Sequence, residues 1–343
     1  MCVKIRAIIP NVNTHDSISM KPVRSLLIVA CALPILSSTS GYSWSAPGHQ
    51  AIAQAAMQML KGTPTEAKVN AILDGESVAD AAIWLDRVRE HFKFDNPSDD
   101  DEAAVFRQDF PGNENWHFCN YIVGSTTYDF SSKFSSNDDV VHALERAIAV
   151  LEGSASKMTK QQALRSVFHL VGDIHQPLHC ITGYYDLSDL NHPVLLKDVE
   201  DPKAAAEDRG GNQLYYTRSQ ELHALWDLGL PRRISTNINT LALKLIVTTA
   251  GSSMITEGDF HHWPEIWAGD SMKQANAAYA GITFDLAAFV PNPRHAGQQM
   301  LKISVSLPAG EKGYKESQQP TVQDQLTKAA VHLTQLLSKI NFK

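Results

Sequence analysis

The chain has few cysteines and no apolar run of the length that crosses a membrane. Four cysteines in 343 residues exclude a small scaffold that is held together by disulfides. The apolar run Leu26–Leu36 is too short for a membrane span and is interrupted by Pro34. Hydrophobic residues make up 43% of the chain and charged residues 20%, which is typical of a globular protein with a sizeable core. The sequence therefore predicts a globular protein without a membrane span.

The N-terminal 43 residues are typical of a segment that is removed during export. From residue 20 onward, two positive charges precede the apolar run, and small polar residues follow it. Gly41 and Ser43 occupy the −3 and −1 positions of a cleavage site ahead of Trp44. We therefore expect residues 1–43 to be an N-terminal extension and signal peptide, and residues 44–343 to be exported to the periplasm or secreted.

Cleavage would leave two cysteines, Cys119 and Cys180. In an oxidising compartment two cysteines suggest one disulfide, and a free thiol that binds a metal is the alternative. A lipoprotein is a second interpretation of the N-terminus, because the residues up to Cys31 resemble a lipid-attachment site, although the apolar core before Cys31 is very short.

The chain also lacks an excess of positive charge. Its formal net charge is −7, and the predicted signal region carries +3, so the mature chain has a net charge of about −10. This balance argues against a broad basic surface that wraps duplex nucleic acid. A phosphate-containing substrate would have to be held locally, by metal ions or by a few cations.

Alternating β patterns are scarce, and apolar residues recur at helical spacing along most of the mature chain. We predict an all-α protein with one multi-helix domain over residues 44–343. The expected helices are 48–60, 77–92, 138–153, 161–176, 217–228, 235–255, 270–280 and 321–340. The connections 93–115 and 181–212 are long, and loops of that length are often functional.

The segment HLVGDIHQPLH, residues 169–179, concentrates side chains that bind metals. On a helix, His169 and Asp173 face the same side because they are four residues apart, and such a pair can hold a metal through two ligands. Pro177 ends the helix and directs His179 toward a different set of ligands. His175 lies on the other side of the helix, where we expect it to have a structural role.

Further candidate ligands lie elsewhere in the chain. The segment ELHALWD repeats the four-residue His/Asp spacing, and other candidates stand in IWLD, in NWHF and just after the predicted cleavage site. An N-terminal Trp44 would add an α-amino nitrogen and a carbonyl oxygen, and such mixed nitrogen and oxygen ligands suit zinc. The set is sufficient for about three zinc ions and consists of Trp44, His49, Asp86, His117, His169, Asp173, His179, His223 and Asp227.

The motifs WSAPGH, IWLD, WHF, HLVGDIHQPLH, RGGN and LHALWD occur in this order and resemble the type I nuclease family. Its members are single-strand-preferring, three-zinc nucleases and 3′-nucleotidases of fungi, plants and bacteria. The resemblance runs from Trp44 to about Asp227, and more loosely to the C-terminal helix. The ordered set is highly specific, whereas RGGN or LHALWD alone would be weak.

The resemblance implies a fold of the zinc phospholipase C and type I nuclease kind, with long loops around a cleft for three zinc ions. It implies hydrolysis of single-stranded DNA and RNA to 5′-phosphate products by a zinc-activated water, with nucleotides as further substrates and no stable protein partner. Its three ligand sets are Asp86, His117, His169 and Asp173; Trp44, His49 and Asp173; and His179, His223 and Asp227. Its catalytic residues are Asp86, Arg89 and Asp173, and its substrate contacts are Arg89, Phe118, Asn120 and Asn212.

Three features depart from the family pattern. Asn120 stands where fungal and plant members often have Asp, which puts the base preference in doubt. The stretch between Asn212 and His223 is short, so we expect the nucleotide site to be shaped differently in this chain than in the family. Cys119 and Cys180 do not match the disulfides of the fungal members.

Two other functions remain open at this point. Secreted zinc phospholipases C resemble this scaffold, but they typically have Glu where Asp227 stands and lack the GDIHQPLH motif. A non-enzymatic periplasmic zinc-binding protein would close each site with four ligands, whereas nine candidate ligands for three ions leave open positions for water.

Overall fold

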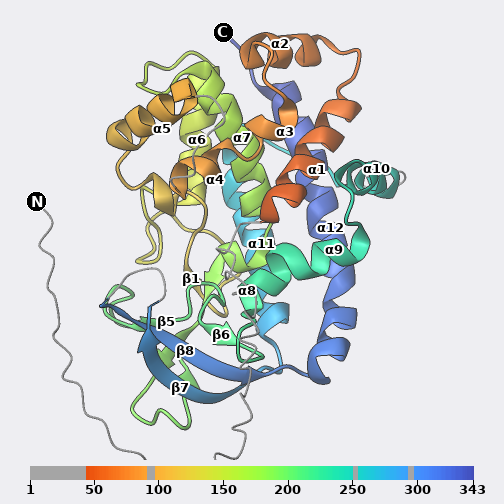
Figure 1. The fold of residues 1–343 in the computed structure, drawn as a ribbon. Coiled ribbons are helices and arrows are strands. Elements are labelled where there is room, and N and C mark those ends of the chain that lie inside the picture. The colour runs from red at the N-terminus through yellow and green to blue at the C-terminus, as the bar shows by residue number, and fades with distance from the viewer. Residues whose placement is uncertain (1–43, 91–96, 250–253, 293–296) are drawn as a thin grey trace, which may run out of the picture. The chain divides into compact units, whose positions relative to one another are not determined.

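The computed structural model describes residues 44–90, 97–249, 254–292 and 297–343. Helices form most of this part of the chain, and the strands apart from β7 (Thr283–Pro291) and β8 (Gln299–Ser306) are only two or three residues long, which confirms the all-α prediction (Figure 1). The predicted signal region lies outside the described residues. No helix within the described ranges has both the length and the apolar character that a membrane crossing requires.

Helix α7 (Lys160–Ile174) lies at the centre of the helical region. It packs against α1 (Ser45–Met59), α2 (Pro64–Leu73), α3 (Val78–Ala81), α4 (Trp84–Arg89), α6 (Val140–Leu151), α11 (Trp263–Tyr279) and α12 (Gly310–Lys339). Every residue from Gln162 to Ile174 on this helix is buried. Its start is fixed by a capping box, in which the Thr159 side chain accepts a hydrogen bond from the backbone of Gln162 and the Gln162 side chain accepts one from the backbone of Thr159. A helix that is buried on all sides and carries polar residues places those residues in the protein core.

The longer helices and the short ones differ in their role. The longer ones build the core and are α1 (Ser45–Met59), α2 (Pro64–Leu73), α5 (Pro97–Asp109), α6 (Val140–Leu151), α7 (Lys160–Ile174), α10 (Ile238–Thr249), α11 (Trp263–Tyr279) and α12 (Gly310–Lys339). The short ones are α3 (Val78–Ala81), α4 (Trp84–Arg89), α8 (Leu222–Ala224), α9 (Leu230–Ile234), the 3-10 helices η1 (Asn113–Asn115), η2 (Pro177–His179) and η4 (Phe260–His262), and the π-helical turn η3 (Leu225–Gly229).

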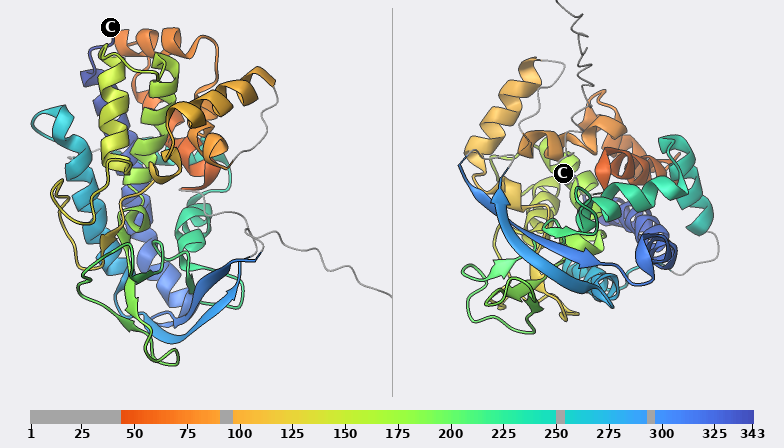
Figure 2. Two further views of the ribbon diagram at one scale, coloured as in Figure 1. Left: turned by 90° about the vertical axis from the view of Figure 1, so that its left-hand side faces the viewer. Right: turned by 60° about the horizontal axis from the view of Figure 1, so that its bottom comes forward.

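The strands form three small sheets. Strands β1 (Tyr121–Ile122) and β2 (Ile181–Thr182) pair in parallel. The second sheet has the order β4 (Val194–Leu195), β3 (Tyr184–Asp186), β5 (Ala206–Glu207), and the third has β6 (Leu214–Tyr215), β8 (Gln299–Ser306), β7 (Thr283–Pro291). Strands β7 and β8 form a long curved hairpin at the end of the molecule away from α2 (Figure 2).

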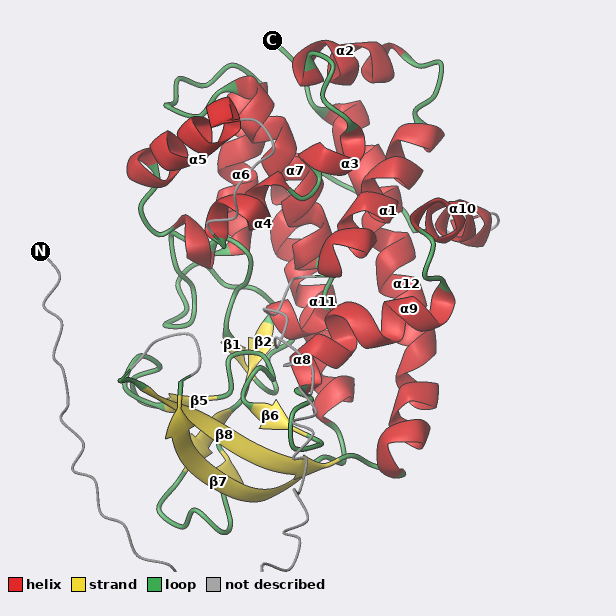
Figure 3. Ribbon diagram, in the orientation of Figure 1, coloured by secondary structure: helices red, strands yellow, loops and turns green. Residues whose placement is uncertain are grey.

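The structure differs from the expected helices at several points (Figure 3). The expected helix 77–92 is two helices, α3 and α4, and the expected loop 93–115 contains α5. Helix α11 begins at Trp263 rather than near residue 270, with Pro264 in its first turn, where proline costs no hydrogen bond. Helix α12 begins at Gly310 rather than near residue 321, with Pro320 inside the helix. The segment 217–228 is helical only from Leu222 onward.

Candidate metal centre

Eight of the predicted ligand side chains converge in the core, and all eight are buried. They form three groups in which the possible ligand atoms lie within 4.8 Å of one another. The groups are His49, His169 and Asp173; Asp86, His117 and His169; and His179, His223 and Asp227. The first two groups share His169, so they form one larger cluster.

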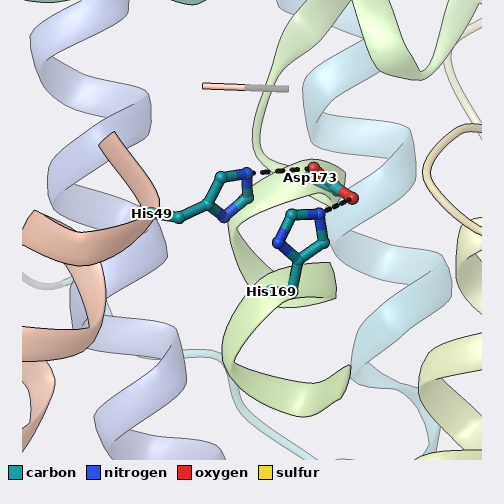
Figure 4. A group of neighbouring side chains, drawn as sticks. All are labelled: His49, His169 and Asp173. Carbon is teal, nitrogen blue, oxygen red and sulfur yellow. Dashed lines mark ion pairs between the residues drawn. The ribbon is translucent and has the colours of Figure 1, made fainter. Parts of the chain in front are cut away.

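Asp173 on α7 is the centre of the larger cluster. Its Oδ1 atom lies 3.3 Å from Nε2 of His49 on α1, and its Oδ2 atom lies 3.1 Å from Nε2 of His169 one helical turn earlier (Figure 4). Nδ1 of His117 reaches the same Oδ2 at 2.9 Å. Asp86 on α4 completes the cluster, with Oδ1 3.6 Å from Nε2 of His169. Both carboxylates therefore face several imidazoles, as in a site that can hold more than one ion.

The third group lies beside the first two. Nε2 of His223 lies 3.1 Å from Oδ2 of Asp227, and Nε2 of His179 lies 4.0 Å from Oδ1 of the same carboxylate. The rings of His179 and His223 are stacked with centroids 5.0 Å apart. Nδ1 of His179 is 3.8 Å from Oδ1 of Asp173, so this short distance links the third group to the larger cluster.

Backbone carbonyls fix the orientation of three imidazoles. Nδ1 of His169 lies 2.8 Å from the carbonyl oxygen of Ala82, and Nδ1 of His223 lies 2.7 Å from that of Gly210. Nδ1 of His179 lies 2.6 Å from the carbonyl oxygen of His117. Because a carbonyl can only accept, each Nδ1 carries a proton, and each Nε2 is directed at the cluster. This arrangement is typical of histidines that bind metals.

The donor atoms that remain unsatisfied fit metal ions. Both carboxylate oxygens of Asp86, Nε2 of His117 and Nε2 of His179 are buried and make no hydrogen bond within the described structure. Buried polar atoms are normally paired, so such a concentration of unpaired ones indicates a site for a ligand. Nitrogen and carboxylate oxygen donors in groups of three suit zinc with an open coordination position.

The acidic and basic groups of the cluster perturb one another. Burial and the Arg89 guanidinium lower the pKa of His117 to about 4, and burial lowers the pKa of His179 to about 4. Burial opposes protonation of His169 as well, but the carboxylates of Asp173 and Asp86 outweigh it and raise the pKa of His169 to about 9. The imidazoles of the cluster therefore differ in how readily they take up a proton, and His169 does so more readily than His117 or His179.

The predicted substrate residues Arg89, Phe118, Asn120 and Asn212 are all half-buried. Nη2 of Arg89 is 3.7 Å from Oδ1 of Asp86 and 3.1 Å from Oε1 of Glu90, so the guanidinium lies beside the larger cluster. Phe118 and Asn120 flank the buried Cys119 and are half-buried. Asn212 is half-buried too, and its side-chain amide donates to the carbonyl oxygen of Arg209.

Both remaining cysteines are buried free thiols in this structure. The backbone amide of Cys119 donates to the carbonyl oxygen of His179, next to Cys180 in the chain. Burial and the neighbouring Cys180 raise the pKa of the Cys119 thiol well above its ordinary value. Neither cysteine belongs to the three groups that could hold a metal. A disulfide between them stays a prediction.

Several residues around the cluster have structural roles that the sequence alone does not predict. Gly172 brings α7 close to His49, since a Cβ atom there would lie 2.6 Å from Nδ1 of His49. Asp208 is fully buried and accepts hydrogen bonds next to the RGGN turn, which supplies the carbonyl for His223. The Gln176 side chain contacts Asp227. In the sequence, the only sign of these roles is their place inside or beside the GDIHQPLH and RGGN motifs.

A mainly helical fold with three buried groups of histidine and aspartate defines a candidate metal-dependent hydrolase. The model of the S1/P1 nuclease family matches residues 44–341, so the chain belongs to this family of nucleases, which hydrolyse phosphodiester bonds.

Named relatives agree with this membership. The chain is similar to endonuclease 2 of Arabidopsis thaliana, with 21% identity over 286 residues that cover 77% of this chain and 87% of the relative. It is 26% identical to nuclease S1 of Aspergillus oryzae over 213 residues, which are 61% of each chain. Endonuclease 1 of Arabidopsis thaliana is 23% identical over 218 residues, which are 59% of this chain and 58% of the relative.

Proposed function

We propose that the protein is a zinc-dependent endonuclease and 3′-nucleotidase that cleaves single-stranded DNA and RNA and leaves 5′-phosphates. Residues 44–343 would be its catalytic domain, exported after cleavage ahead of Trp44 and active in the periplasm or outside the cell. The observation that carries the proposal is the convergence of eight buried ligand side chains in three neighbouring groups.

The residues divide among three zinc ions. Asp86, His117, His169 and Asp173 hold one; His49, Asp173 and the N-terminal nitrogen and carbonyl oxygen of Trp44 hold its neighbour; and His179, His223 and Asp227 hold the third. Bound there, zinc would lower the pKa of a water so that it attacks phosphorus at neutral pH, and would neutralise charge on the leaving oxygen. The contact between Asp173 and both His49 and His169 supports the shared role of this carboxylate.

The chain's own residues contribute position and charge. Arg89 binds a phosphate oxygen beside the larger cluster, where its guanidinium offsets the negative charge that builds up during attack. Asp86 orients Arg89 and ligates at the same time, since one of its oxygens lies 3.7 Å from the guanidinium. Phe118, with Asn120 and Asn212, supplies the surface on which a base stacks and forms hydrogen bonds.

Single-strand preference follows from this mode of binding. A stacked base has to be reached from its face, which is possible in a single strand and not in a paired duplex. The chain carries a formal net charge of −7, so it lacks the positive charge that would hold the backbone of a duplex over many phosphates.

Metal content and substrate assays on the secreted protein test the proposal. We expect a mass that begins at Trp44, three zinc ions per chain, and cleavage of single-stranded DNA and RNA with release of phosphate from 3′-nucleotides. Little cleavage of duplex DNA and none of phosphatidylcholine are expected. Hydrolysis of phosphatidylcholine in place of nucleic acid would identify a phospholipase C instead. If the fully metallated protein cleaved no phosphoester, the result would support a non-enzymatic zinc-binding protein.

A pair of variants separates the site from the scaffold. Asp173→Asn should lose zinc and reduce kcat by more than about 100-fold, the upper range for residues that only orient ligands. Asp139→Asn is the matched control, because Asp139 is a buried carboxylate that caps α6 and belongs to none of the three groups. Full activity and full zinc content in Asp173→Asn would contradict the assignment.

A further inference from the structure

Gln176 connects three of the candidate ligand residues. Its backbone amide donates to the carbonyl oxygen of Asp173, and its own carbonyl accepts from the backbone amide of His179. Its side chain is fully buried and spans to Asp227, which lies on the π-helical turn η3. One residue thus contacts a ligand of the larger cluster and two ligands of the third group.

The orientation of the Gln176 amide follows from its partners. The backbone N–H of Leu178 can only donate, and it lies 2.7 Å from the side-chain oxygen of Gln176. The side-chain NH2 group must therefore face Asp227, whose Oδ1 atom it reaches at 2.6 Å. A short hydrogen bond from an amide to a carboxylate holds that carboxylate in one rotamer.

This hydrogen bond leaves the other oxygen of Asp227 for the metal site. Oδ2 is buried, makes no hydrogen bond among the described residues, and lies 3.1 Å from Nε2 of His223. The same Gln176 side chain caps η2, the short helix that carries His179. It therefore couples the position of Asp227 to that of His179.

We propose that Gln176 is a positioning residue for the third metal ion: its amide fixes Asp227 and its cap fixes His179, so that both ligands converge before the metal arrives. The inference rests on the proposed zinc sites. Groups that orient metal ligands in this way typically change metal affinity by roughly 10- to 100-fold when they are replaced.

Gln162, in the first turn of α7, offers a matched control. Its side-chain oxygen accepts from the backbone amide of Thr159, and its NH2 group donates to Oε1 of Glu102 at 2.9 Å. Gln176 and Gln162 thus make the same two kinds of hydrogen bond, one to a backbone amide and one to a carboxylate. Only Gln176 makes them beside a candidate metal group. Gln176→Glu and Gln162→Glu each place two carboxylates against one another.

The test is zinc competition with a chromophoric chelator on the mature chain, which resolves the ions by affinity. We expect Gln176→Glu to weaken the third zinc by roughly 10- to 100-fold while two ions stay at wild-type affinity. Gln162→Glu should hold all three as the wild type does, even if both variants lose similar thermal stability. Gln176→Met, which removes the hydrogen bonds without adding charge, should weaken the third ion as well and serves if Gln176→Glu does not fold.

The outcomes separate the two proposals. The role of Gln176 would be overturned, with the zinc assignment intact, by either of two results. One is a third zinc held within about twofold of the wild-type affinity in both Gln176 variants, and the other is an equal weakening in Gln162→Glu. A wild-type protein that binds no zinc in the third group would overturn the zinc assignment and this inference with it.

Discussion

Nε2 of His49 on α1 lies 3.3 Å from Oδ1 of Asp173 on α7, although more than a hundred residues separate them in the chain. The His49 ring also stacks on that of His169, with centroids 3.9 Å apart. Both contacts require α1 and α7 to approach closely. The residue that allows this approach is Gly172, whose missing side chain leaves room for the imidazole.

Gly172→Ala should displace His49. The added methyl group would lie 2.6 Å from Nδ1 and 2.8 Å from Cε1 of a ring that is fully buried, so the ring has to move. We expect a loss of about 1–3 kcal/mol in the free energy of unfolding and fewer zinc ions per chain. Gly269→Ala on α11 is the control. Its added methyl group would lie 3.1 Å from the carbonyl oxygen of Thr126, which is not part of the cluster. Wild-type zinc content in Gly172→Ala would show that His49 is not a ligand.

The residue at the N-terminus should control one zinc ion. Trp44 is fully buried and directly precedes α1, whose His49 belongs to the larger cluster. A chain that begins at Trp44 would offer a free amine to the metal, whereas a chain that begins at Ser43 has an amide there. We expect elemental analysis to find about one zinc ion fewer in the longer chain. Equal zinc content and equal activity in the two chains would exclude the amine as a ligand.

Asp208→Asn should destabilise the protein. The Asp208 carboxylate accepts hydrogen bonds from the hydroxyl groups of Thr182, Tyr185 and Tyr279 and from the backbone amides of Gly183 and Gly211. All five partners donate to the carboxylate. An amide NH2 in place of one oxygen can donate only to a hydroxyl that turns its own hydrogen away, so at least one buried donor loses its acceptor. We expect a loss on the order of 3 kcal/mol in the free energy of unfolding of the zinc-free protein, measured in urea.

An exposed carboxylate is the control for that measurement. Asp285 accepts a hydrogen bond from the Ser306 hydroxyl at the surface, and Asp285→Asn should change the free energy of unfolding by less than about 0.5 kcal/mol. A similar small loss in Asp208→Asn would mean that the buried carboxylate contributes little.

Acid should destabilise the zinc-free protein through His332. Nδ1 of His332 lies 2.6 Å from Nε2 of His175, whose Nδ1–H donates to the carbonyl oxygen of Val171. Nδ1–H of His332 therefore donates to Nε2 of His175. Burial lowers the pKa of His332 to about 4 from 6.5, against the carboxylates of Asp270 and Asp324 and with the help of Lys328.

The sign of the effect follows from this lowered pKa. The unfolded chain binds a proton to His332 below pH 6.5 and the folded chain only below about pH 4, so the contribution of His332 to stability is present above pH 6.5 and is lost between pH 6.5 and 4. The loss should be about 3 kcal/mol. Unfolding free energies of the wild type and of His332→Asn across this range test it, because the metal ligands titrate in both. Parallel pH curves for the two proteins would contradict the prediction.

The helical character of the chain and the same-face His/Asp pairs could be predicted from local spacing. In both the His169/Asp173 and the His223/Asp227 pair, the imidazole Nε2 lies 3.1 Å from the carboxylate Oδ2, because side chains four residues apart on a helix face the same side. His175 lies on the opposite side, as its spacing indicated, and there it contacts His332. Trp44 and the assignment of ions to ligands remain predictions.

Other features depend on contacts that no local pattern reports. Strand β8 does alternate, with Leu301, Ile303 and Val305 buried, but most residues of its partner β7 are exposed or half-buried, so the hairpin was missed. Gln176 and Gly172 acquire their roles only when α7 meets η3 and α1. Residues of this kind look like ordinary helix-end glutamine or helix glycine until the partner element is in place.

Helix α7 is buried from Gln162 to Ile174, so metal ions held by its His169 and Asp173 would lie in the core rather than on the surface. Ions bound there would stabilise the folded chain and not the unfolded one, so each tenfold rise in free zinc above the dissociation constant would add about 1.4 kcal/mol per ion. Outside the cell, where proteases remove unfolded chains, zinc supply would then set how long the protein survives as well as how fast it works.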